Sequence, residues 1–100
     1  MARLNVTEKL ILSGANNENA MLNLAYRKAY EFFEDASYLV NDNFCTVLDV
    51  LYKQKHETLT FENIARNNGL SLSKLNRFRQ SFIKLFIRYK ARLSEQQNAA

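Results

Sequence analysis

Apolar residues recur at three- and four-residue steps along most of the chain, which is the spacing that places them on one face of an α-helix. No segment shows the sustained alternation of apolar and polar residues that a half-buried strand requires. The pattern therefore predicts an all-α fold of about five helices. Their expected bounds are 5–13, 18–40, 44–54, 61–67 and 72–95, with a frayed tail over 96–100.

Residues suited to helix caps and turns separate these segments. Asn5 or Thr7 is expected to cap the first helix and Gly14 to end it. Thr60 and Ser71 are expected to cap the last two helices. Turns or loops are expected at 15–17, 41–43, 55–58 and 68–71.

The helix predicted over 18–40 has two apolar faces. The face expected to meet the core contains Met21, Leu24, Ala25, Phe32, Ala36 and Leu39. The other face is aromatic and contains Tyr26, Tyr30 and Phe33. Either both faces are covered within one chain, or the aromatic face meets a partner chain, and the pattern leaves both open.

The last predicted helix also has more apolar surface than one core contact needs. Its main stripe is Leu75, Phe78, Phe82, Leu85 and Tyr89, widened by Ile83, Phe86 and Ile87. Together with the aromatic face of 18–40, this excess predicts a homodimer. The expected dimer contacts are Tyr26, Tyr30, Phe33, Ile83 and Ile87.

Composition excludes several classes of protein. With 100 residues, a net charge of +4, one Cys and one His, the chain has no internal disulfide, no four-cysteine zinc site and no multi-histidine metal site. It has no apolar run of membrane-spanning length and no secretory leader, so we expect a cytoplasmic protein without a membrane partner. Cys45 is expected to be a buried, reduced side chain.

No catalytic or cofactor motif is present, since phosphate loops, dinucleotide glycine motifs and nucleophile elbows are absent. Glu31, Glu34 and Asp35 cluster on one turn, but they are expected to form a solvated acidic face. His56 lies in a polar loop without an evident partner. We therefore expect no enzyme, no metal and no cofactor.

The segment 60–93 has the pattern of a helix-turn-helix unit, followed by a long basic continuation of its second helix. Such a unit needs a small residue where the helices cross and a turn residue that tolerates positive φ. Ala65 and Gly69 meet these two requirements. The apolar residues that fall on the facing sides of the two helices are Ile64, Leu70, Leu75 and Phe78.

Phe61–Ala65 together with Gly69–Ser71 resembles the helix-turn-helix of bacterial transcription regulators, above all the fourth region of sigma factors and related small phage and plasmid regulators. The similarity extends back to Val47–Tyr52 and forward through Lys84 and Leu85, over roughly 39–88. It implies sequence-specific binding to double-stranded DNA in transcription regulation, with RNA polymerase as a further candidate partner. Residues 1–58 would then be the scaffold and dimerisation part, and 59–95 the DNA-binding part, of one compact domain.

The charge distribution agrees with that expectation. Residues 1–59 carry six Lys/Arg and eight Asp/Glu, a net charge of −2, whereas residues 60–100 carry eight Lys/Arg and two Asp/Glu, a net charge of +6. In the last helix, seven basic residues precede its first acid, Glu95. A local positive field of this kind attracts the DNA backbone.

The resemblance also implies roles for individual residues. Those expected to reach base edges are Ser71, Leu72, Ser73, Asn76, Arg77 and Gln80. Those expected to contact phosphate are Arg66, Lys74 and Lys84. For each basic residue the alternative is a solvated helix face.

Two other classes of function are open. One is a protein-interaction module, an adaptor or inhibitor of another transcription protein, with no DNA affinity of its own. The other is an RNA-binding helical domain, which would usually expose aromatic rings for base stacking. The aromatic residues here follow core spacing instead, so the DNA-binding interpretation is preferred.

Overall fold

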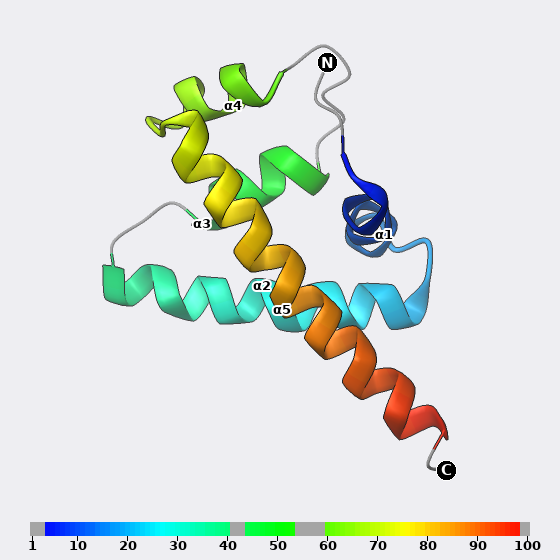
Figure 1. Cartoon of the computed structure of the whole chain (residues 1–100). Coiled ribbons are helices and arrows are strands. Elements are labelled where there is room, and N and C mark those ends of the chain that lie inside the picture. Colours follow the sequence, from blue (N-terminus) through cyan, green and yellow to red (C-terminus); the bar gives the residue numbers. More distant parts are fainter. Residues whose placement is uncertain (1–3, 41–43, 54–59, 99–100) are drawn as a thin grey trace.

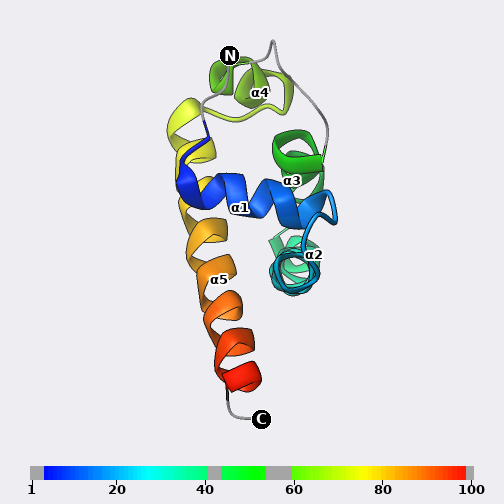
Figure 2. The same cartoon turned by 90° about the vertical axis from the view of Figure 1, so that its right-hand side faces the viewer.

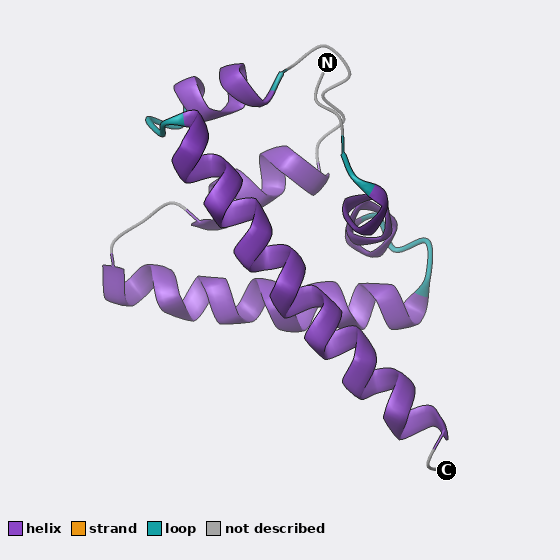
Figure 3. Cartoon of the chain, viewed as in Figure 1, coloured by secondary structure: helices purple, strands orange, loops and turns teal. Residues whose placement is uncertain are grey.

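The computed structural model describes residues 4–40, 44–53 and 60–98, with side-chain surroundings over 4–35, 45–53 and 60–95. Its elements are α1 (Val6–Ala15), α2 (Ala20–Val40), α3 (Phe44–Leu48), the π-helical turn η1 (Asp49–Lys53), α4 (Phe61–Asn67) and α5 (Leu72–Asn98). No strand occurs within these described ranges, as Figure 3 shows. The predicted all-α class is confirmed.

The long helix α5 crosses α2 in the view of Figure 1. Turned by 90°, the molecule shows α5 along one side and α2 and α3 on the other, with α1 running across between them (Figure 2). Helix α4 lies at one end of the molecule and the C-terminal end of α5 at the other. One side of α5 therefore packs against the body of the protein, and no other described helix covers the opposite side.

Helix α1 begins at Asn5, one of the two caps that the sequence allows. The Asn5 side chain accepts a hydrogen bond from the Glu8 backbone N–H at 2.8 Å, and Glu8 Oε1 accepts one from the Asn5 N–H at 3.3 Å. Gly14 does not end the helix, because α1 continues to Ala15. Its role is close packing, since a Cβ at Gly14 would lie 2.5 Å from the backbone oxygen of Leu22 on α2.

The buried face of α2 is not the face expected from the sequence. Leu24 and Phe32, both predicted to be in the core, are 42% and 52% exposed. Ala25 of the predicted face is buried and Met21 is partly buried, and the other buried residues of α2 are Leu22, Tyr26, Ala29 and Phe33. Because Ala25 and Ala29 are small, this face can approach its neighbours closely. Ala36 and Leu39, also predicted in the core, lie outside the residues whose side chains are described.

Phe82 of α5 is the centre of an aromatic cluster in the core. Its ring centroid lies 5.8 Å from that of Tyr26, 5.7 Å from that of Phe33 and 5.7 Å from that of Tyr52. Tyr26 is 2% exposed and Phe33 is 9% exposed. The expectation that these two residues form dimer contacts is therefore wrong, because one chain already covers them.

Two other segments differ from their predicted form. The helix expected over 44–54 changes from α to π winding at Asp49, and Leu51 and Tyr52 of the π turn are buried. The tail expected to fray from residue 96 is helical through Asn98. The break at 41–43, the loop at 55–58 with His56, and the boundary between 58 and 59 lie outside the described residues. No described helix combines the length and the apolar character needed to cross a membrane.

Candidate nucleic-acid interface

Helices α4 and α5 are joined by a tight turn whose local hydrogen bonds match the sequence prediction. Thr60 Oγ1 accepts from the Asn63 N–H at 3.2 Å and caps α4, and Ser71 Oγ accepts from the Lys74 N–H at 3.1 Å at the start of α5. Gly69 has φ +69°, the left-handed conformation that favours glycine. These local contacts fix where one helix ends and the next begins.

The end of α4 forms a paired C-terminal cap. The Leu70 N–H donates to the Ala65 carbonyl at 2.8 Å, and the Gly69 N–H donates to the Arg66 carbonyl at 3.2 Å. Ala65 is 2% exposed, as a small residue at a helix crossing should be. The residues predicted to face the core from the two helices are also buried or packed against it, namely Ile64, Leu70, Leu75 and Phe78.

Nearly all the predicted DNA-contacting residues are exposed. They are Arg66 on α4, Ser71 in the turn, and Leu72, Ser73, Lys74, Arg77, Gln80 and Lys84 on α5. Leu72 is the apolar member, with 39% of its surface exposed. Asn76 differs from the others, because it is partly buried and its side chain has a partner within the protein.

Four of these exposed residues form a single row on α5. Ser73, Arg77, Gln80 and Lys84 follow one another at steps of four, three and four residues, which places them on one helix face. The opposite face carries the buried residues Leu75, Phe78, Phe82 and Phe86. We call Ser73, Arg77, Gln80 and Lys84 the exposed row.

The exposed row lies in a positively charged environment. Lys74, Arg77, Lys84, Arg88 and Arg92 are all exposed on α5, and no acid occurs on this helix before Glu95. From Arg77 to Arg88 the helix rises by about 16 Å, which exceeds the roughly 12 Å width of the DNA major groove. Basic groups on this surface can therefore reach phosphates on both sides of a groove.

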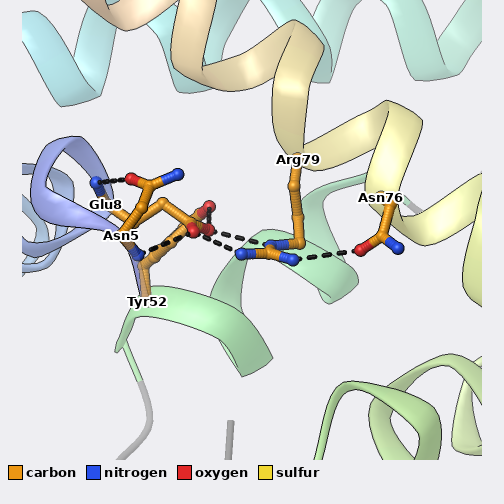
Figure 4. Close-up of polar contacts among 5 residues, drawn as sticks. All are labelled: Asn5, Glu8, Tyr52, Asn76 and Arg79. Carbon is orange, nitrogen blue, oxygen red and sulfur yellow. Dashed lines mark hydrogen bonds and ion pairs between the residues drawn. The ribbon is translucent and has the colours of Figure 1, made fainter. Parts of the chain in front are cut away.

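Arg79 belongs to α5 but does not contribute to this surface. Its Nε donates to Glu8 Oε2 at 2.9 Å, and its Nη2 forms an ion pair and hydrogen bond with Glu8 Oε1 (Figure 4). Glu8 is completely buried and also accepts a hydrogen bond from the Tyr52 hydroxyl at 2.8 Å. The guanidinium carbon of Arg79 lies 3.6 Å from the ring centroid of Phe61, the first residue of α4. This buried ion pair thus links α1, η1, α4 and α5.

Sequence reasoning missed the buried ion pair. The spacing of Asn5 and Glu8 is a signal for a capping box, but it does not indicate that the carboxylate is buried. Glu8 and Arg79 are 71 residues apart, so no local pattern joins them. Helical spacing places Arg79 beside the buried stripe of α5. That position is the sign in the sequence that its surroundings differ from those of the exposed row.

The remaining predicted residues occupy varied surroundings. Of the expected dimer contacts, Tyr30 and Ile83 are partly buried and Ile87 is 48% exposed. Glu31, Glu34 and Asp35 are exposed on α2. Within the part of the chain that the structure describes, no group of three or more His, Cys, Asp or Glu side chains is placed to hold a metal ion. Cys45, expected to be buried, is only partly so.

The buried tyrosines make stability sensitive to alkaline pH. Burial raises the pKa of the Tyr52 hydroxyl well above its usual range, and the nearby charge of Glu8 raises it further. Burial likewise raises the pKa of Tyr26. The folded protein therefore retains protons that an unfolded chain releases near pH 10, so stability is unaffected below that pH and decreases above it.

We expect each such tyrosine to lower the free energy of unfolding by about 1.4 kcal/mol at pH 11, because its hydroxyl ionises in the unfolded chain and stays protonated in the folded protein. Urea unfolding at pH 9 and pH 11 measures the decrease. In Tyr52→Phe the protein should lose less between these two pH values than the wild type does. An equal loss in both proteins would show that ionisation of Tyr52 has no part in it.

Comparisons with protein-family models, with curated proteins and with solved structures gave no match to this chain. The features of this chain that bear on its function are therefore the exposed row, the charge around it and the turn that precedes it.

Proposed function

We propose that this protein is a helix-turn-helix transcription regulator that binds double-stranded DNA in a sequence-specific manner. The observation that carries the proposal is the exposed row of α5, a line of hydrogen-bonding side chains on a basic helix surface without acids. It follows directly after a capped, tightly packed turn, which holds the start of α5 in a defined place. In proteins of this type the second helix enters the major groove with its N-terminal residues against the bases.

The residue types on this surface suit the two kinds of contact that DNA offers. Arg77 can donate two hydrogen bonds to guanine, and Gln80 can pair with adenine. Ser71 and Ser73 can contact either a base or a phosphate, and Leu72 can pack against a thymine methyl group. The side chains assigned to phosphate contacts are Arg66, Lys74 and Lys84.

A homodimer on paired half-sites would suit this function, and cyclic dimers are the commonest soluble oligomers. Its contacts would have to come from Tyr30, Ile83 and Ile87, since Tyr26 and Phe33 are buried within one chain. Binding through the exposed row does not require a dimer, because one chain can occupy one site. The resemblance to bacterial regulators further suggests a cytoplasmic location and RNA polymerase as a partner.

The first test is fluorescence anisotropy of labelled random duplex DNA, titrated with protein from low to physiological salt. We expect micromolar binding at low salt that weakens steeply as salt increases, because bound phosphates release counterions. The variant Lys74→Gln/Lys84→Gln should reduce the slope of log K against log salt by about 2. Arg27→Gln/Lys28→Gln removes the same charge from exposed positions on α2 and should leave the slope unchanged.

Absence of duplex binding at low salt would contradict the proposal and favour a protein-interaction module. Tighter binding to single-stranded RNA in the same titration would favour an RNA-binding domain instead. Equal reductions of the slope in both double variants would show only a general effect of net charge.

A further inference from the structure

Asn76 lies at the border between the exposed row and the buried ion pair. It precedes Arg77 of the row and is three residues before Arg79 on the same helix. Arg79 Nη1 donates a hydrogen bond to Asn76 Oδ1 at 3.0 Å. Asn76 is partly buried, and its amide oxygen contacts Arg79.

The chemistry of arginine decides which end of the amide faces inward. A guanidinium group has only donors, so Asn76 must present its oxygen to Arg79. Its nitrogen, which carries two N–H donors, then lies on the side away from Arg79, as Figure 4 shows. Arg79 is in turn held by two hydrogen bonds from its guanidinium to the buried Glu8 carboxylate. The orientation of the Asn76 amide is therefore set from inside the protein.

We infer that Asn76 acts in the DNA interface solely as a hydrogen-bond donor, with Arg79 and Glu8 as its positioning residues. This inference rests on the proposed function and assigns a specificity to one of its residues. A free asparagine pairs with adenine by accepting from N6 while donating to N7. Oδ1 keeps a second lone pair, but the hydrogen bond turns it toward Arg79, so the N–H₂ end points away and suits acceptor atoms on the groove edge, such as guanine O6 and N7 or thymine O4.

Asn76→Asp is the most direct test, because it keeps an oxygen for Arg79 and replaces the outward N–H₂ by a second acceptor. Binding-site selection is first carried out with the wild-type protein, and affinities for its preferred site and for all single-base changes are then measured. We expect Asn76→Asp to bind the preferred site about tenfold more weakly. We also expect it to shift preference at one base pair toward bases that present a donor, cytosine N4 or adenine N6.

Gln80→Glu is the matched control, since it makes the same change of charge and chemistry at an exposed position one turn further along α5. It should alter a different base pair and leave the position assigned to Asn76 unchanged. Asn76→Ala removes the donor without adding a charge, and it should flatten the preference at the same base pair as Asn76→Asp. Thermal unfolding of each variant shows whether the fold is retained, and the alanine variant carries the test if Asn76→Asp does not fold.

A wild-type protein that binds no duplex DNA would overturn the proposed function itself. A wild-type protein that binds, together with Asn76 variants that keep its affinity and base preference, would overturn only the inference. The inference would also be overturned by a selected site with adenine at this position, where removing the N6 amino group weakens wild-type binding but not that of Asn76→Ala. That result would show that Asn76 accepts as well as donates.

Discussion

Replacing Arg79 by Met is expected to lower the free energy of unfolding by about 3–5 kcal/mol, the usual cost of removing one partner from a buried ion pair. Glu8 has no exposed surface, so its carboxylate would lose its cation without gaining water. The Tyr52 hydroxyl and the Asn5 N–H would be its remaining donors. The substitution would also remove the contact between the guanidinium group and the Phe61 ring, which loosens the packing of α5 against the start of α4.

Urea unfolding followed by circular dichroism measures this change, with Arg92→Met as the control. Arg92 is exposed on the same helix, and the same substitution there should change stability by no more than about 0.5 kcal/mol. The double variant Glu8→Gln/Arg79→Met removes both charges and should be more stable than Arg79→Met alone. If the double variant were as unstable as the single one, lost packing and not an uncompensated carboxylate would explain the effect.

Features that depend on neighbours in the sequence could be predicted from the sequence. The caps at Asn5, Thr60 and Ser71 each satisfy a backbone N–H three residues away. Positive φ at Gly69 follows from the turn that separates two helical patterns. For the same reason the bounds of α4, Phe61–Asn67, agree with the prediction at both ends. The physical cause of each of these features lies within a few residues.

The choice of face on α2 could not be settled in this way. Two apolar stripes run along this helix, and helical spacing gives both equal weight. Packing decides the outcome: Tyr26, Ala29 and Phe33 are buried, while Leu24 and Phe32 remain exposed. The decision depends on α1 and α5, whose positions are not encoded in the periodicity of α2.

The candidate site shows the same division. The exposed row follows from the apolar stripe on the opposite face of α5, so its exposure could be predicted from helical spacing. Counting charges, in contrast, treated Arg79 as one more basic residue of α5 that could attract DNA, although it is paired with an acid 71 residues away. The orientation of Asn76 depends on that pair and was equally beyond local reasoning. Long-range ion pairs change which basic and polar residues are available to a ligand.

Arg77→Ala is expected to weaken binding to the selected DNA site by about 1–3 kcal/mol, roughly 5- to 150-fold, and to relax the preference at one base pair. Arg77 is exposed in the middle of the exposed row, one turn from Gln80 and Ser73. An arginine there can donate two parallel hydrogen bonds to guanine O6 and N7, and alanine leaves both acceptors without a protein partner. The loss should therefore be large on the selected site and small on random DNA.

Arg92→Ala supplies the matched control for charge, because it removes an exposed arginine from the same helix about 22 Å further along. Affinities of both variants are measured at one salt concentration, for the selected site, its single-base changes and random duplex. Arg92→Ala should reduce all of these affinities by a similar small factor, as expected for a distant positive charge. If Arg77→Ala did the same, Arg77 would be a phosphate contact, and sequence selection would have to come from Gln80, Ser73 and the donor-only amide of Asn76.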